Sequence, residues 1–232
     1  VVEQAFIDYT TDMITVGKRG TLDMISKGHS CLFLPAVHKK KKYFTLKYAA
    51  SFPSCAQNGL PTVQCAIWLF SAETGQAHAM IQANKLTGIK TGAASAVATR
   101  YLANQHASIL TIIGAGEQAK TQLAAISRIR QIKEVRLVDL EIERCNALKQ
   151  WAELNLKPQY PILAFTPDNH LIFDADIIVT CTTSSRPVLM GENINQGTHI
   201  NAIGAFTPDM QEIDEKTVVR ADKIVADSAE EA

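Results

Sequence analysis

The sequence predicts an α/β protein in which a mixed α+β domain is followed by a doubly wound, parallel sheet. Three observations support this prediction. The first part of the chain contains apolar, alternating segments of strand length that are separated by turn residues. The second part alternates short apolar runs with helical patterns, which is typical of βαβ units. A glycine-rich turn at 114–119 joins one apolar run to a helical pattern. We place one domain at 1–95 and the other at 96–232.

The first domain is expected to begin with an amphipathic helix over about 1–16. Its expected strands are 21–25, 31–37, 43–50, 62–70 and 76–82. Proline, asparagine and glycine mark a loop over 51–61 and a turn at 73–75. These segments predict a mostly antiparallel sheet with helical cover.

An alanine-rich helix over 86–103 leads into the second domain, and small residues such as Gly92 predict that it packs closely. The expected strands of this domain are 109–113, 135–138, 161–164, 176–181, 198–203 and 223–226. The expected helices are 117–129, 141–154 and a short one near 168–173. Their alternation predicts a parallel sheet of the Rossmann type.

The turn at 114–119 has the G-x-G-x-x-A pattern of a dinucleotide site. Gly114 permits the tight turn, Gly116 lets a pyrophosphate approach the backbone, and Ala119 keeps the helix close to the strand. The helix that starts at Glu117 and Gln118 offers N–H groups and a partial positive charge to the phosphates. The alternative is an ordinary strand-to-helix turn.

Asp139 ends the second apolar run, 20 positions after Ala119. A carboxylate there can accept both hydroxyls of an adenosine ribose and would repel a 2′-phosphate. We therefore expect NAD(H) as the preferred cofactor, with NADP(H) possible.

Two later strands also end in residues that suit a cofactor site. Ligands of open α/β sheets bind beyond the carboxyl ends of the strands. The candidates there are Thr182, Thr183, Asn201, Ile203 and Gly204. Each could instead simply belong to a strand or to its end.

Composition excludes several classes of function. The 232 residues carry 23 basic and 23 acidic side chains, so charge gives no reason to expect nucleic acid or membrane binding. Four lysines at 39–42 are predicted to form a solvated turn. The five cysteines include no C-x-x-C pair, which favours free thiols in a reducing cytoplasm, and the scattered histidines predict no metal site. No signal peptide is visible, but position 1 is valine, so targeting stays open.

Four motifs occur in an order that is similar to the ornithine cyclodeaminase and mu-crystallin family. They are residues 59–64, 86–96, the turn at 114–119, and 197–204 followed by 208–212. The resemblance implies hydride transfer between a nicotinamide and the α-carbon of a small amino or imino acid. Members convert ornithine to proline with loss of ammonia, oxidise alanine, or reduce cyclic imines, and mu-crystallin binds thyroid hormone. The resemblance also implies a homodimer formed by the first domain. It further implies more chain at both ends, including a segment beyond Ala232 that returns to the first domain.

The resemblance assigns the substrate pocket residue by residue. Arg19 would bind the substrate carboxylate, Lys47 would face its nitrogen and carboxylate, and Thr62 would contact the nicotinamide side of the cofactor. Lys47 also lies in an apolar strand, where an inward lysine needs a partner or a lowered pKa. Lys90 stands where the family usually has arginine, and lysine lacks the planar fork of arginine.

Phe206 occupies the position where cyclodeaminases carry an acid–base aspartate, and phenylalanine cannot move a proton. We therefore expect reduction of a cyclic imine, such as a pyrroline or piperideine carboxylate. Arg19 and Lys90 would hold the carboxylate, and Lys47 would orient the substrate and donate a proton. The alternatives are ornithine cyclodeamination with Asp209 as the substitute acid, alanine dehydrogenation, and a non-catalytic protein that binds a small ligand.

Overall fold

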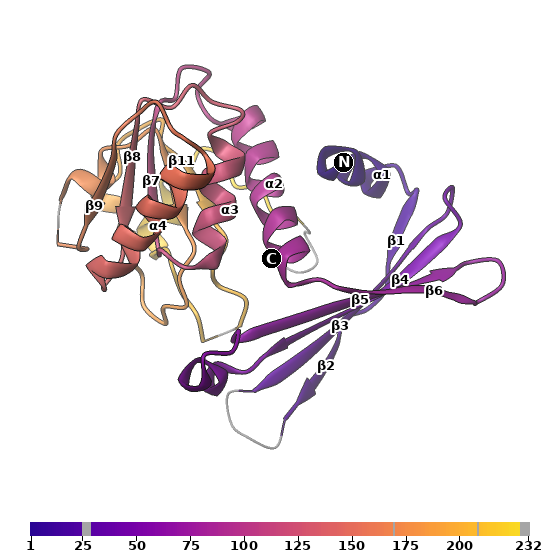
Figure 1. Cartoon of the computed structure of the whole chain (residues 1–232). Coiled ribbons are helices and arrows are strands. Elements are labelled where there is room, and N and C mark those ends of the chain that lie inside the picture. Colours follow the sequence, from indigo (N-terminus) through magenta and orange to yellow (C-terminus); the bar gives the residue numbers. More distant parts are fainter. Residues whose placement is uncertain (25–28, 169, 208, 228–232) are drawn as a thin grey trace. The chain divides into compact units, whose positions relative to one another are not determined.

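The computed structural model describes residues 1–24, 29–168, 170–207 and 209–227. The chain forms two compact units, Val1–Lys90 and Thr91–Ala232 (Figure 1). The division lies within helix α2 (Asn84–Leu102), five residues before the expected boundary. Ile25 of the expected strand 21–25, Asn169 of the expected short helix and Pro208 of the last motif lie outside the described residues.

The first unit is built on a six-stranded antiparallel sheet in the order β1-β3-β4-β5-β6, with β2 paired to β3. Its strands are β1 (Ile14–Val16), β2 (Gly20–Asp23), β3 (Ser30–His38), β4 (Tyr43–Ser51), β5 (Val63–Ser71) and β6 (Ala77–Gln82). Helix α1 covers Val2–Thr10 and a 3-10 helix covers Pro53–Asn58. The expected antiparallel sheet with a helix is therefore present.

The expectation of one helix over 1–16 is wrong at its end. The helix stops at Thr10, and Asp12 adopts a positive φ of 58°, which an α-helix does not allow. The chain then forms β1, which pairs with the end of β3. Apolar periodicity did not reveal this switch because β1 is only three residues long.

Strand register places the residues of this sheet on two distinct faces. Lys47 lies opposite Leu34 on one side and Ile67 on the other. Since side chains alternate along a strand, these three share one face, and Tyr48 and Trp68 lie on the other. Helix α1 contacts the Lys47 face, where Asp8 lies 3.2 Å from His38.

The second unit contains a five-stranded parallel sheet in the order β11-β10-β7-β8-β9. Its strands are β7 (Ile109–Ile113), β8 (Glu134–Val138), β9 (Ile162–Phe165), β10 (Ile177–Thr180) and β11 (His199–Ala202). The chain runs outward from β7 in one direction and then returns to add β10 on its other side. This reversal is the switch point of a doubly wound sheet, so the predicted fold class is confirmed.

Both faces of the parallel sheet are buried. Helices α3 (Glu117–Ile126) and α4 (Ile142–Asn155) lie side by side on one face (Figure 1). The core beneath them includes Leu110, Ile112, Leu123, Leu137 and Leu148. The opposite face buries Ile113, Val138, Ala175, Ile178 and Leu189. Burial on two sides explains why these strands are apolar runs rather than alternating segments.

The close packing expected of the alanine-rich helix occurs at Gly92. A Cβ atom on this residue would lie 2.5 Å from the backbone oxygen of Thr121 in α3. Only glycine lets the backbones of α2 and α3 approach this closely.

The second unit differs from the expectations in four further places. Residues 223–226 form no strand: Ile224 and Val225 are 68% and 63% exposed, and no strand among the described residues pairs with this apolar run. The helix expected to reach 129 ends at Ile126. A five-residue helix, α5 (Glu215–Val219), was not expected, and it is capped by Asp214, whose side chain accepts from the Thr217 N–H. The short helix near 168–173 is a 3-10 helix at His170–Phe173.

Among the residues that the structure describes, no helix has both the length and the hydropathy needed to span a bilayer.

Candidate active site

The glycine-rich turn lies between β7 and α3, at the switch point of the parallel sheet. Gly114 has a φ of +98°, and a Cβ there would lie 2.8 Å from the backbone oxygen of Cys181. Its N–H donates to the Val138 oxygen at 2.7 Å. Glycine is therefore required at 114 for the backbone conformation and for the close approach of the segment that follows β10.

Gly116 has a different role from Gly114. Its backbone is extended, it caps α3, and no atom lies within 4 Å of where a Cβ would stand. Ala119, by contrast, is fully buried against the sheet. The first turn of α3 has N–H groups without helical partners, so a phosphate fits the open space at Gly116.

Glu117 and Gln118 form the first turn of α3 behind this opening. The Glu117 carboxylate is paired with Lys120 at 2.5 Å. This pairing offsets a negative charge that would otherwise oppose a bound phosphate. Gln118 is half-buried, and its side-chain oxygen has no hydrogen-bond partner among the described residues.

Asp139 stands at the end of β8 and faces the glycine-rich turn. Its Oδ2 accepts the Ala115 N–H at 2.8 Å, and its Oδ1 accepts the Glu141 N–H at 3.1 Å. A carboxylate has about four acceptor positions. Two acceptor positions therefore remain for ribose hydroxyls, and the carboxylate is held in place by the turn itself.

The ends of β10 and β11 lie beside the turn on the same edge of the sheet. Thr183 is exposed, and the Ile203 N–H donates to the Thr180 oxygen at 3.0 Å. Asn201 is buried and donates to the Thr99 hydroxyl at 3.0 Å, so its amide is engaged with α2. The structure therefore leaves the Thr183 hydroxyl better placed for a ligand than the Asn201 side chain.

Glu212 is a residue of this edge that the sequence did not single out by role. It is 2% exposed and accepts hydrogen bonds from Thr180, Thr182 and Gly204. The sequence shows only an acidic residue at the end of a motif, and no periodicity predicts that such a residue folds inward. Its burial follows from the path of the loop after β11.

Lys47 of the first unit has two further cations near it, Arg19 and Lys90. Burial lowers the pKa of the Lys47 ammonium, the nearby Cys65 opposes this shift, and Lys90 and Arg19 lower the pKa further. Lys47 is half-buried in β4, whereas Arg19 and Lys90 are exposed. Lys47 is paired across the sheet with Leu34 and Ile67, so its strand neighbours on this face are apolar. This group of like charges suits an anionic ligand such as a carboxylate.

The remaining predicted residues lie in loops. Thr62 precedes β5 in the first unit and is exposed, and its carbonyl accepts the Phe52 N–H at 2.7 Å. Phe206 follows β11 in the second unit and is 49% exposed. Asp209 in the same loop has a pKa held below its ordinary value, chiefly by the Thr207 hydroxyl.

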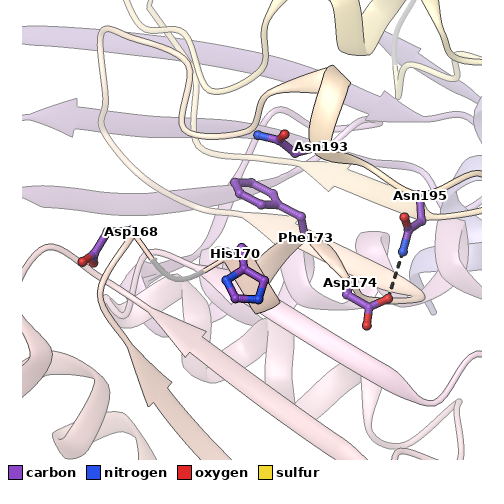
Figure 2. A pocket seen from close by; sticks show the side chains of 6 residues that line it. All are labelled: Asp168, His170, Phe173, Asp174, Asn193 and Asn195. Atoms are coloured by element: carbon purple, nitrogen blue, oxygen red, sulfur yellow. Dashed lines mark hydrogen bonds between the residues drawn. The ribbon is translucent and has the colours of Figure 1, made fainter.

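A separate cavity of about 520 Å³ lies in the second unit (Figure 2). It is lined by Asp168, His170, Phe173, Asp174, Asn193 and Asn195, and the Asn195 amide donates to Asp174 at 2.9 Å. Asp168 and His170 follow β9, whereas Asp174 and Asn195 precede β10 and β11. None of the six lining residues belongs to the glycine-rich turn or to the ends of β10 and β11.

Within the described part of the chain, no group of three or more histidine, cysteine or acidic side chains is arranged to hold a metal ion. All five cysteines are free thiols. Burial raises the pKa of Cys145 to about 11 and raises that of Cys181 still more, so neither is a reactive thiolate near neutral pH.

Comparison with known proteins agrees with this geometry. The model of the ornithine cyclodeaminase/mu-crystallin family matches residues 1–232. A Delta(1)-pyrroline-2-carboxylate reductase of Bacillus thuringiensis is 35% identical over 229 residues, which cover 98% of this chain and 69% of the relative.

Two solved structures share the fold. The Thermococcus litoralis Delta(1)-pyrroline-2-carboxylate reductase, in complex with NADH and L-proline, has a TM-score of 0.88 and 31% identity, and the match covers 94% of this chain and 67% of that one. An archaeal alanine dehydrogenase dimer with bound NAD has a TM-score of 0.86 and 32% identity over 95% of this chain and 66% of that one. With the motifs, the fold and these matches together, the chain belongs to the ornithine cyclodeaminase/mu-crystallin family.

Proposed function

We propose that this protein is an NAD(H)-dependent oxidoreductase that reduces a cyclic imino acid of the pyrroline-2-carboxylate type. The observation that carries the proposal is the half-buried Lys47, which has a lowered pKa and two further cations near it. The relatives named as pyrroline-2-carboxylate reductases and the open glycine-rich turn support the same reading. The protein is thus an enzyme of amino-acid metabolism.

The residues of the first unit account for binding and proton transfer. Arg19 and Lys90 hold the substrate carboxylate as positive charges near Lys47. The Lys47 ammonium donates a proton to the substrate nitrogen, which makes the neighbouring carbon electrophilic. When bound, the nicotinamide supplies the hydride that this carbon accepts. Thr62 is proposed to contact the nicotinamide side of the cofactor.

The residues of the second unit hold the dinucleotide. The pyrophosphate would lie over Gly116 at the start of α3, and the ribose hydroxyls would reach Asp139. Thr183 and the backbone at Ile203 and Gly204 would border the cofactor at the neighbouring strand ends. Because Asp139 is a fixed negative charge at the ribose position, we propose NAD(H) over NADP(H).

Ornithine cyclodeamination is less well supported by this chain. That reaction needs an acid–base group for the amine proton, and Phe206 stands at the position where the family has one. The substitute considered from the sequence, Asp209, has a lowered pKa, so it is a weak proton acceptor. Alanine dehydrogenation would use the same residues to hold the substrate carboxylate and the same hydride transfer as imine reduction. Activity measurements with the two substrates therefore distinguish these reactions.

We propose that the protein is a homodimer formed through the first unit. The sheet face opposite Lys47 carries a stacked pair, Phe44 and Phe70, whose ring centroids are 4.6 Å apart, together with Tyr48 and Trp68. Met80 on this face is 68% exposed. A large apolar face suits burial against a second copy. The related alanine dehydrogenase is a dimer.

The five cysteines are free thiols, which suits a reducing compartment, and we propose that the protein is located in the cytoplasm.

The function is tested by following NADH absorbance with two separate mixtures. One contains pyrroline-2-carboxylate, and the other contains pyruvate with ammonia. Rapid NADH oxidation with the cyclic imine alone supports the proposal. Turnover with pyruvate and ammonia alone would make the protein an alanine dehydrogenase. Release of proline and ammonia from ornithine with catalytic NAD would overturn the proposal in favour of cyclodeamination, and NADH binding without turnover would favour a binding role.

A further inference from the structure

The side chain of the buried Glu212 accepts four hydrogen bonds at the ends of β10 and β11. Its Oε1 accepts from the Thr182 N–H at 2.6 Å and from the Thr182 hydroxyl at 2.8 Å. Its Oε2 accepts from the Thr180 hydroxyl at 2.9 Å and from the Gly204 N–H at 2.6 Å. One buried carboxylate therefore joins the end of β10 to the end of β11.

The backbone of Glu212 is also fixed. Its carbonyl oxygen accepts from the Val188 N–H at 2.8 Å and from the Leu189 N–H at 3.1 Å. Leu189 is fully buried in the sheet core. The carboxylate thus projects from a segment that is itself anchored, which makes it a rigid support for the two strand ends.

The chemistry of the cluster excludes a direct catalytic role for Glu212. Four hydrogen bonds fill the acceptor positions of a carboxylate, so none remains to take a proton from a ligand. Among the described residues, the donors to Glu212 are neutral hydroxyl and N–H groups. Hydrogen bonds to a charged acceptor are stronger than those between neutral groups, especially at a buried position.

The cluster also decides which neighbouring groups are available to a ligand. The Thr182 hydroxyl donates to Glu212 and accepts from the Ser184 N–H at 3.3 Å, so its proton is already used. A Cβ at Gly204 would lie 2.2 Å from the Thr182 oxygen and 2.6 Å from Glu212 Oε1. The absence of a side chain at 204 therefore serves the cluster, and of the two threonines it is the exposed Thr183 whose hydroxyl is left for a ligand.

We infer that Glu212 is a positioning residue that holds the Thr182–Thr183 and Gly204 strand ends in the geometry that binds the dinucleotide. This inference rests on the proposed NAD(H)-dependent function, because these strand ends border the proposed cofactor site. The residues proposed to hold the substrate, Arg19, Lys47 and Lys90, belong to the first unit.

The test replaces Glu212 with glutamine, which keeps the shape of the side chain. The amide nitrogen is a donor, and it would face either the Thr182 N–H or the Gly204 N–H, leaving one backbone donor without an acceptor. We expect the Kd for NADH, measured by fluorescence titration, to rise by about tenfold or more. The KM for the imino acid at saturating NADH should change little. Glu192→Gln is the matched control, because Glu192 is an exposed glutamate of the same unit that pairs with Lys216.

The outcomes of this titration distinguish failure of the positioning role of Glu212 from failure of the proposed NAD(H)-dependent function. Wild-type protein that binds NADH, together with an unchanged Kd for the folded Glu212→Gln variant, overturns the positioning role alone. Wild-type protein that fails to bind NADH overturns the proposed function and this inference with it. A rise in the KM for the imino acid equal to the rise in Kd for NADH would indicate general damage and would also overturn the positioning role.

If the Glu212→Gln variant does not fold, a measurement on the wild-type protein tests the positioning role of Glu212. Amide hydrogen exchange should show the Thr182 and Gly204 N–H groups protected, and protected further when NADH is added. Exchange of both amides at the rates of an unstructured loop would overturn the inference.

Discussion

Lys47 shows how a single charged side chain acquires a chemical role from its strand neighbours. The lysine is paired across the sheet with Leu34 and Ile67, and burial partly removes its ammonium from water. Burial, with Lys90 and Arg19, holds its pKa below the ordinary lysine value of 10.5. A lysine with a lowered pKa gives up its proton more readily, as an imine reductase requires.

The lowered pKa of Lys47 predicts the pH dependence of the reaction. The protonated form is needed for proton donation, so kcat/KM should fall as pH rises through the pKa of Lys47, below the range of a free lysine. Lys47→Arg keeps the charge but cannot release a proton near this pH, so its low activity should lack this alkaline decline. A pH–rate profile of both proteins checks the prediction, and an unchanged decline in the variant would assign the titration to another group.

Removing the charge of Lys47 should also change stability. Because the folded-state pKa is lowered, the unfolded chain binds more protons between the two pKa values, and stability rises with pH across that window. Near neutral pH the buried charge therefore opposes folding. We expect Lys47→Met to abolish turnover and raise the Tm by roughly 2–4 °C, about 1 kcal/mol. A thermal scan that shows a lower Tm would contradict this account of the site.

Asp139 predicts a measurable cofactor preference. The carboxylate accepts the Ala115 N–H and has positions left for ribose hydroxyls. Asp139→Ala should weaken NADH binding by about tenfold and narrow the gap between NADH and NADPH, because a negative charge no longer faces the 2′ position. Titrations with both cofactors test this, with Asp222→Ala as an exposed control. An unchanged ratio of the two Kd values would show that Asp139 does not face the ribose.

Substitutions at two glycines of the second unit should affect different properties, protein stability at Gly92 and NADH binding at Gly116. Gly92→Ala places a Cβ against the backbone of Thr121, so we expect it to destabilise the protein by about 1–3 kcal/mol despite the better helix propensity of alanine. Gly116→Ala meets open space and an allowed backbone, so the Tm should stay unchanged while NADH affinity falls. Thermal scans and NADH titrations of both variants test the pair. Equal effects on stability would mean that the two positions do not differ as described.

At the level of elements, the sequence predicted long or periodic segments well and short ones poorly. The strands of the parallel sheet are recognisable because they are buried on both faces. The strand β1 and helix α5 are too short to show a period. The apolar run at 223–226 looked like a strand, but a strand also needs a hydrogen-bonded neighbour, which composition does not reveal.

At the level of the whole molecule, the proposed dimer gives a direct test. Met80→Lys puts a charge on the exposed apolar face of the first unit, and burying that charge against a second copy would be unfavourable. We expect the variant to shift from dimer to monomer in size-exclusion chromatography with light scattering. Thr74→Lys, at the exposed turn between β5 and β6, is the control and should remain dimeric. A monomeric wild-type protein would overturn the proposal.

The sequence by itself determined the fold class, the family and the dinucleotide turn. These features depend on local signals: apolar runs, the glycine spacing at 114–119, and motifs in a fixed order. The tertiary structure alone revealed the placement of Lys47 between apolar neighbours, the hydrogen bond from Ala115 to Asp139, and the burial of Glu212. The physical reason is that desolvation and hydrogen bonding depend on residues far apart in the chain, such as Thr180 and Glu212, whose meeting is set by strand order and loop path.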